Sequence, residues 1–421
     1  MECVTWMERY LAAGITLVML SGCQSMQPSL TPLPTLSPTT SAEVGFAPDA
    51  VEPLVPSPAP ALHTSQWWEI TVQQRDLDLV RDSGFRWVKQ IFPWREIEVE
   101  DDVFDWTQAD QFVENALDRK LFIVARLDRE PAWALTSPAN ASVENTPPSD
   151  YAQFEAFCYE IAYRYRNKIR AYQVWNEPNL AREWGGQPPN PDDYVRLLAH
   201  CYNGIKRGDP AAIVISAGLA PTGTGLPEAL PDEEFLRRMY AAGAARYFDM
   251  LGVNAPGYKA APWLSPEEAA AAPDLGGQRW AAFRHVEDVR RIMVEAGDAT
   301  KQIAILEMGW TLDPVHPEYA WFAVSEQQQA EYLSAAYHWA HDHWQPWIGI
   351  MTTIYIPDQH WTEDDEQYWW SVVVPGWPHT DYREAYWALV DLPDWDAGQY
   401  PAWDAYLDAW NSVYDLRRSG P

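Results

Sequence analysis

Short apolar runs alternate with amphipathic segments along the chain from about residue 61 to residue 410. The runs have the length of buried strands, and the segments between them repeat their apolar positions with the period of a helix. The predicted strands are Ala61–Gln66, Trp87–Phe92, Leu121–Leu127, Ala171–Trp175, Ala212–Gly218, Phe248–Asn254, Gln302–Gly309 and Trp347–Ile356. The predicted helices are Val72–Ser83, Gln108–Arg119, Tyr151–Asn167, Pro191–Arg207, Asp232–Ala242, Trp280–Ala296, Ser325–His341, Asp381–Val390 and Ala402–Tyr414.

Eight successive strand–helix units in roughly 350 residues predict an α/β protein with the (β/α)8 TIM-barrel fold. An open, doubly wound sheet is the alternative. No glycine-rich dinucleotide turn follows any of the predicted strands, which argues against that alternative. In a TIM barrel the loops that follow the strands gather at one face, where the active site lies.

Two acidic residues stand at predicted strand ends. Glu177 follows the fourth strand in "YQVWNEPN", and Glu307 closes the seventh in "IAILEMGW". A carboxylate at the tip of a buried strand is unfavourable unless it is paired or used. Strands four and seven face each other across a barrel mouth, and two facing carboxylates suit glycosidic bond cleavage. Each acid alone could instead cap a following helix.

The motifs "WNEPN" and "LEMGW" resemble those of the clan A glycoside hydrolases, which are retaining (β/α)8-barrel enzymes. The segments "SGFRWVKQIFPWREIE" and "YRYRNKIRAYQVWNEPN" are most similar to the branch of β-xylosidases and α-iduronidases. The resemblance covers residues 61–410 and implies a polysaccharide or oligosaccharide substrate, with no cofactor and no metal. The motif pair is specific to the clan and not to a substrate.

Matched by position, the resemblance implies that Glu177 is the acid/base and Glu307 the nucleophile. It also implies that Asn176 holds the sugar 2-hydroxyl, and it makes Tyr258 the candidate to hydrogen-bond the nucleophile. Two positions depart from the family pattern. Lys89 stands where relatives often have Arg, and Asn254 stands where they often have His. The Lys ammonium is a point charge, whereas the Arg guanidinium is planar and can donate two hydrogen bonds to one carboxylate. Asn can hydrogen-bond but cannot titrate. Both departures leave the type of substrate open.

The chain contains 24 tryptophans, and most of them are expected in the core. Trp133, Trp310 and Trp361 fall in predicted strand-end loops, where we expect them to stack on sugar rings. The sequence "HWAHDHW" brings three histidines together, but their spacing follows one face and the end of a helix. We therefore expect no metal there.

The net charge of −30 repels nucleic acid and anionic lipid, which excludes both as expected partners. The N-terminus instead suggests export. The apolar run Leu11–Leu20 suits a signal peptide and is too short to span a bilayer. The following "LSGC" resembles a bacterial lipobox, which implies lipidation of Cys23. An ordinary secretory signal is the alternative.

These features predict a signal peptide at residues 1–22, a proline-rich linker at 23–60 and a catalytic domain at 61–421. The protein would then be extracellular or in the cell envelope, held to a membrane only through Cys23. Cys158 and Cys201 remain, either as a disulfide or as two buried thiols. The alternative function is a lipoprotein that binds glycan on the barrel without cleaving it, for which a pair of acids has no use.

Overall fold

The computed structural model describes residues 46–65, 69–136 and 145–395. Eight parallel strands form its main sheet, in the order β7-β6-β5-β2-β1-β10-β9-β8. Their bounds are β1 (Ala59–Thr64), β2 (Trp87–Pro93), β5 (Phe122–Asp128), β6 (Ala171–Val174), β7 (Ile213–Ile215), β8 (Leu251–Pro256), β9 (Ile303–Gly309) and β10 (Ile348–Ile356). Isolated parallel bridges from Ile215 to Met250 and from Leu219 to Val253 join the two outer strands. The sheet is therefore a nearly closed barrel, as predicted.

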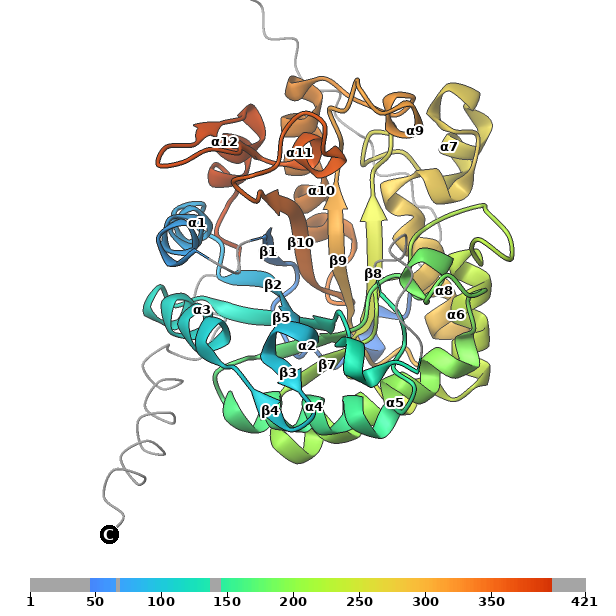
Figure 1. The fold of residues 1–421 in the computed structure, drawn as a ribbon. Coiled ribbons are helices and arrows are strands. Elements are labelled where there is room, and N and C mark those ends of the chain that lie inside the picture. The colour runs from blue at the N-terminus through green and yellow to red at the C-terminus, as the bar shows by residue number, and fades with distance from the viewer. Residues whose placement is uncertain (1–45, 66–68, 137–144, 396–421) are drawn as a thin grey trace, which may run out of the picture. The chain divides into compact units, whose positions relative to one another are not determined.

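Helices follow the strands and surround the barrel (Figure 1). The larger ones are α1 (Ile70–Asp82), α3 (Thr107–Asp118), α4 (Tyr151–Arg164), α5 (Pro191–Gly208), α6 (Asp232–Ala241), α8 (Val286–Glu295), α10 (Glu326–His343) and α12 (Glu384–Val390). Four shorter helices are α2 (Trp94–Ile97), α7 (Pro266–Ala271), α9 (Pro317–Ala320) and α11 (Glu366–Trp370). Helices α7, α9 and α11 lie beyond the arrowheads of β8 and β9 in Figure 1. None of the described helices is both long and apolar enough to cross a bilayer.

Local sequence signals explain where several of these helices begin. Asn190 accepts a hydrogen bond from the backbone N–H of Asp193, with Pro191 in the first turn of α5. Ser325 and Gln328 form a capping box at the start of α10. These side chains satisfy N–H groups that lack a partner inside the helix. The predicted starts of both helices therefore agree with the structure to within a residue.

The barrel interior follows the two-residue alternation of strand side chains. Its apolar layer includes Ala61, Trp87, Val124 and Ala171. Two residues further along the same strands the inward side chains are polar: His63, Lys89, Arg126 and Gln173. The lower barrel is thus filled with apolar side chains, and a polar layer lies above it toward the strand ends.

The structure corrects the predicted boundary between linker and domain. Residues 46–60 were assigned to an extended linker, but this part of the chain packs against the barrel. The Gln302 amide accepts hydrogen bonds from the backbone N–H groups of Leu54 and Val55 and donates one to the Val55 carbonyl. Val55 belongs to the apolar layer inside the barrel. The prolines here end regular structure without preventing the segment from covering the bottom of the barrel.

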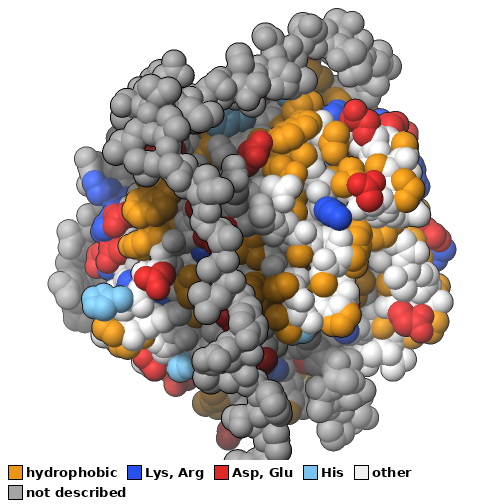
Figure 2. Space-filling model, turned by 90° about the horizontal axis from the view of Figure 1, so that it is seen from above, with side chains coloured by type: hydrophobic (Ala, Val, Ile, Leu, Met, Phe, Trp, Pro, Cys, Tyr) orange, Lys and Arg blue, Asp and Glu red, His pale blue; other side chains and the backbone are white. Residues whose placement is uncertain are grey.

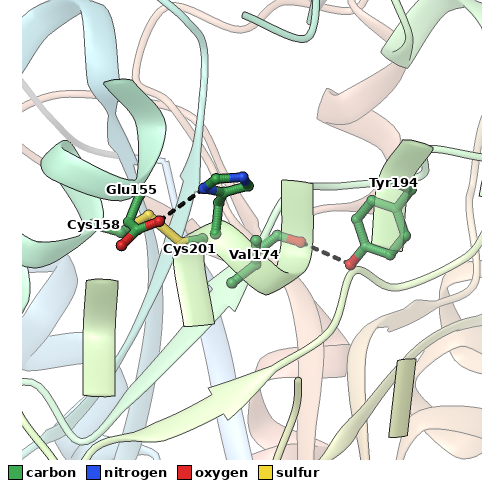
Figure 3. Close-up of a disulfide and its surroundings, with 6 residues drawn as sticks. Glu155, Cys158, Val174, Tyr194 and Cys201 are labelled. Carbon is green, nitrogen blue, oxygen red and sulfur yellow. Dashed lines mark hydrogen bonds and ion pairs between the residues drawn. A yellow bond between two sulfur atoms is a disulfide. The ribbon is translucent and has the colours of Figure 1, made fainter. Parts of the chain in front are cut away.

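A disulfide joins Cys158 of α4 to Cys201 of α5 (Figure 3). Of the two alternatives left open by the sequence, the structure contains the disulfide. The two helices also pack closely at Gly204. A Cβ added at this glycine would lie only 2.4 Å from the Glu155 carbonyl oxygen. The Tyr194 hydroxyl of α5 donates to the Val174 carbonyl at 3.1 Å, so α5 is also tied to the end of β6.

Within the barrel, β7 (Ile213–Ile215) is shorter than the predicted strand Ala212–Gly218, and β8 begins at Leu251 instead of Phe248. The other differences lie outside the barrel strands. Two small antiparallel sheets were not predicted, namely β3 (Glu98–Glu100) with β4 (Val103–Phe104) and β11 (Val373–Val374) with β12 (Asp381–Tyr382). The helix predicted from Trp280 begins at Val286, because two short 3-10 turns precede it. The predicted signal peptide, Cys23 and the helix predicted at Ala402–Tyr414 lie outside the described residues.

Candidate active site

The two candidate acids reach the barrel mouth through distortions of regular strand structure. Glu177 has a positive φ of 41°, three residues past the end of β6, and its N–H donates to the Gly218 carbonyl at 3.0 Å. In β9, Leu306 points into the barrel, and the register with β8 shifts just before Glu307 pairs with Asn254. A register shift of this kind re-aims a side chain. The shift explains how Leu306 and Glu307, which are consecutive in β9, can both direct their side chains toward the inside of the barrel.

A single amide group connects the two carboxylates. The Asn254 Nδ2 donates to Glu177 Oε1 at 2.9 Å and to Glu307 Oε2 at 3.3 Å. The sum of these two lengths, about 6.2 Å, is therefore the largest possible distance between those oxygens. This limit lies below the ~6.5–9.5 Å that separates the carboxyl groups of inverting glycosidases, and it admits the ~5–5.5 Å of retaining ones. The prediction that the two acids face one small site is met.

Two buried cations face Glu307. The Lys89 ammonium lies 3.2 Å from Glu307 Oε1 and also donates to the Leu306 carbonyl at 2.9 Å. Arg126 lies 3.5 Å from the same carboxylate oxygen and forms a close ion pair with Asp128. Burial lowers the pKa of Lys89 to about 8, although the charge of Glu307 opposes that shift. These contacts hold one oxygen of Glu307 between two positive charges.

Glu177 has a different environment. Burial raises its pKa, the charge of Arg182 acts in the opposite direction, and the charge of Glu307 raises it further. Arg182 Nη2 lies 3.2 Å from Glu177 Oε2, and the arginine side chain is 52% exposed. The pKa of Glu177 is raised, and Glu307 lies between two cations. Two carboxyl groups in such different surroundings can divide the work, because one can donate a proton while the other is ionised.

The structure places Asn176 at the mouth and corrects the expectation for Tyr258. Asn176 is nearly buried, and its Oδ1 accepts from Gln173 Nε2 at 3.3 Å. The Tyr258 hydroxyl donates to the Pro221 carbonyl at 2.7 Å instead of hydrogen-bonding Glu307. Its ring packs against Trp280 and Phe322. The loop after β8 therefore turns Tyr258 toward the loop after β7.

The three predicted sugar-stacking tryptophans differ in exposure. Trp310 was expected at the mouth, but it is fully buried and its indole N–H donates to the Ala260 carbonyl at 2.9 Å. It packs under Gly257, where an added Cβ would lie 1.8 Å from the ring. Trp133 and Trp361 are half-buried at strand-end loops. Trp133 lines a surface pocket with residues of α2 and β3, and Trp361 lies against the ring of Tyr355.

Three residues near the acids were not singled out from the sequence. Arg182 contacts Glu177, and His63 and Tyr355 lie near the ends of β1 and β10, with ring centroids 5.1 Å apart. Burial and the charges of Lys89, Arg126 and Arg129 lower the pKa of His63 well below its usual value. Neither ring nitrogen of His63 has a hydrogen-bond partner among the described residues. His63 and Tyr355 lie inside the strands predicted at Ala61–Gln66 and Trp347–Ile356, where a polar ring next to apolar residues is the signal that marks each of them.

The clustered histidines of α10 do not converge on one point. His338 Nδ1 contacts the Ser334 carbonyl of its own helix, and His343 lies against the ring of Trp339. Among the described residues, the groups with metal-ligand spacing are Glu233, His285 and Asp288, and Glu98, Asp101 and Asp102. Neither group includes the two candidate acids.

The surface beyond the strand ends carries exposed apolar side chains. Figure 2 shows hydrophobic side chains gathered on the face that lies uppermost in Figure 1. Exposed members of the strand-end loops are Trp263, Val315, Trp321 and Trp377. Aromatic surface of this kind is suited to the apolar faces of sugar rings.

Comparisons with known proteins identify the fold. No protein-family model and no curated protein matches the sequence. A family 39 glycoside hydrolase from Bacteroides cellulosilyticus WH2 is similar in structure, with a TM-score of 0.55 and 16% identity. That similarity covers 79% of this chain, which spans 63% of the family 39 protein.

Two further solved structures belong to other glycoside hydrolase families. GH5_18 from Streptomyces cattleya, in complex with GlcNAc, has a TM-score of 0.55 and 14% identity, covering 83% of this chain and 82% of its own. A GH10 endoxylanase from a sugarcane soil metagenome has a TM-score of 0.51 and 15% identity, covering 80% and 98%. All three neighbours are clan A glycoside hydrolases. The protein therefore has the TIM-barrel fold of the clan that its motifs resemble.

Proposed function

We propose that this protein is a retaining glycoside hydrolase, with Glu177 as acid/base and Glu307 as nucleophile. The observation that carries the proposal is the Asn254 amide nitrogen, which lies within hydrogen-bond distance of both carboxylates. A protein that only binds glycan has no need of two acids brought so close together. The clan A fold and the "WNEPN" and "LEMGW" motifs support the same assignment.

The proposed reaction has two displacement steps. In the first, Glu307 forms a bond to the anomeric carbon while the glycosidic bond breaks and the proton of Glu177 passes to the leaving oxygen. In the second, Glu177 takes a proton from water, and the water oxygen displaces Glu307 from the anomeric carbon. Both carboxyl groups return to their starting states, and the sugar keeps its anomeric configuration.

The surrounding residues fit these roles. Lys89 and Arg126 keep positive charge beside the carboxylate that must be ionised to attack. Burial favours the protonated form of Glu177, which the first step requires. Asn254 can donate hydrogen bonds to both acids, but its amide does not titrate. The catalytic proton is therefore carried by the two carboxyl groups and not by Asn254. We propose that Asn176 contacts the sugar 2-hydroxyl and that Trp133 and Trp361 contact more distant parts of the substrate.

The proposed substrate is a polysaccharide or oligosaccharide outside the cytoplasm. The Cys158–Cys201 disulfide supports export, because disulfides persist in oxidising compartments. The "LSGC" sequence ending at Cys23 supports a lipid anchor. On this reading the barrel acts on glycan in the cell envelope or outside the cell.

Turnover of Glu177→Gln and Glu307→Gln variants on a panel of aryl glycosides and polysaccharides tests the assignment. Each variant should lose several orders of magnitude in kcat/KM without losing its fold. Glu155→Gln is the matched control, because Glu155 also pairs with a cation, Arg207, but lies on α4 outside the barrel. Azide should restore Glu307→Gly with an inverted product and Glu177→Ala with a retained product. Wild-type protein that binds glycans but cleaves none would instead establish the alternative, a glycan-binding barrel.

A further inference from the structure

The ion pair between Arg182 and Glu177 gives the two oxygens of this carboxyl different surroundings. Oε1 faces Asn254, which is 3% exposed and lies inside the barrel mouth. Oε2 faces Arg182, whose side chain is half exposed. A leaving group that approaches from solvent therefore has access to Oε2. A glycosidic oxygen that approached from solvent would meet Oε2 at the position that Arg182 now holds.

Proton donation and the ion pair compete for this one oxygen. A general acid must lie about 2.6–3.2 Å from the atom it protonates. Arginine has five N–H donors and no acceptor, so it cannot accept a hydrogen bond from a protonated Oε2. The guanidinium therefore favours the carboxylate, whereas the leaving group requires the carboxylic acid.

The backbone that carries Arg182 is held on both sides, while its side chain extends toward solvent. Leu180 forms a β-bridge with Ala229, and the N–H of Ala181 donates to the Glu228 carbonyl at 2.8 Å. Glu183 is buried and accepts from the Asn145 amide. On this fixed backbone, the guanidinium changes position by rotation of the arginine side chain.

We propose that Arg182 is a positioning residue that exchanges with the leaving group at Oε2 of Glu177. The inference rests on the proposed function and deepens it. Arg182 leaves Oε2 when the glycosidic oxygen arrives, so that Glu177 can donate its proton there. When the leaving group departs, Arg182 returns to the newly formed carboxylate and favours the ionised base that activates water.

Other charged and titratable groups also face Glu177, and they stay in place in the proposed exchange. They are Glu307, Arg126, Tyr258, Tyr319 and Tyr355. Arg182 differs from the other two cations near the acids, Lys89 and Arg126, which are 0% and 7% exposed. It is the cation of this set that a substrate can displace.

The test compares the pH dependence of Arg182→Ala with that of wild-type protein on an unactivated glycoside. The profile of kcat/KM reports the free enzyme, and the profile of kcat reports the enzyme–substrate complex. Loss of Arg182 should move the alkaline limb of kcat/KM up by roughly half to one pH unit, less than for a close buried pair because the arginine is half exposed. The alkaline limb of kcat should stay in place, because the leaving group has already displaced Arg182.

A substrate with a strongly activated leaving group, such as a 2,4-dinitrophenyl glycoside, isolates the second step. On this substrate the acid limb of kcat should move up in Arg182→Ala, because the base Glu177 ionises less readily without the guanidinium. Arg182→Lys should restore part of each shift. Arg237→Ala is the matched control, because Arg237 is 53% exposed and pairs with Glu295 far from the site, on α6.

Each outcome decides between the alternatives. Equal shifts in kcat/KM and kcat on the unactivated glycoside would mean that Arg182 stays at Glu177 throughout, and the exchange would be wrong. No shift in either would mean that the ion pair does not act on Glu177. If wild-type protein cleaves no glycoside, the proposed function fails and the exchange fails with it. Carbon NMR of 13Cδ-labelled glutamates, with Glu177→Gln as the assignment control, would then still show whether Arg182 lowers the pKa of Glu177.

Discussion

The Lys89→Met substitution would remove the buried ammonium beside Glu307 and keep an unbranched side chain of similar length. Lys89 is 0% exposed, and burial lowers its pKa from the ordinary value of 10.5 to about 8. This difference corresponds to roughly 3 kcal/mol by which the charged lysine destabilises the folded protein at pH 7. We therefore expect Lys89→Met to be at least as stable as the wild type at pH 7, despite losing an ion pair.

The sign of the pH dependence follows from the lowered pKa. Below pH 8 the lysine is charged in both the folded and unfolded states, and the full penalty is present. Between pH 8 and about 10.5 the unfolded chain binds the proton more tightly, so wild-type stability should rise with pH. The stability advantage of Lys89→Met should shrink over the same window.

Turnover should change in the opposite direction. Lys89 donates to Glu307, and hydrogen bonds to charged groups contribute about 1.5–3 kcal/mol. If that contribution is made in the transition state, kcat/KM should fall about ten- to a hundredfold. Arg126 would remain as the second cation at Glu307 and would limit the loss.

Urea unfolding at pH 7 and at pH 9.5, with kcat/KM measured on the same preparations, checks both parts. Lys206→Met is the control, because Lys206 pairs with Asp249 at 2.7 Å and lies on α5. That variant should keep its turnover. A Lys89→Met protein more than about 1 kcal/mol less stable than wild type, or with kcat/KM within threefold of it, would refute the reasoning.

Three further predictions concern other parts of the chain. The Cys158–Cys201 bond spans 43 residues, for which chain entropy gives about 4 kcal/mol, so urea unfolding of the double alanine variant should show a loss near that size; a loss below about 1 kcal/mol would contradict it. Trp310→Ala truncates a core side chain and should lower the free energy of unfolding by about 3–5 kcal/mol. Trp361→Ala should instead raise KM with little change in melting temperature. The reverse pattern would restore Trp310 as a sugar contact. Cys23→Ser should release active protein from the membrane fraction with unchanged kinetics on small substrates, and mass spectrometry of native protein should find lipid on Cys23.

The barrel could be predicted from the sequence because its strands and helices differ in period and alternate eight times. The first strand is present as β1 (Ala59–Thr64), two residues before the predicted Ala61–Gln66, and it pairs with β2 on one side and β10 on the other. The end of the proline-rich segment was harder to predict. Its attachment depends on Gln302, almost 250 residues away, and composition carries no signal of such a contact.

The site could be predicted where a strand determines the direction of the side chain. Lys89 and Asn254 lie on strands, and both contact the acids. Trp310 and Tyr258 lie just after strands, where the course of the loop decides whether a ring faces the mouth or the core. Arg182 lies in a loop too, and only its distance from Glu177 in three dimensions reveals its place in the site.

The burial of the cations matches what each carboxyl must do during the proposed reaction. Glu307 must be ionised when it attacks and must leave as a carboxylate, and its two cations are buried and fixed. Glu177 must change its protonation state twice in each turnover, and its cation is half exposed. A buried cation at Glu177 would favour the carboxylate at every stage and would oppose the first step. An exposed cation at Glu307 would be screened by solvent and would compete poorly with protonation of the nucleophile. The difference in exposure between Lys89 and Arg182 therefore supports the proposed roles of the two acids independently of the sequence motifs.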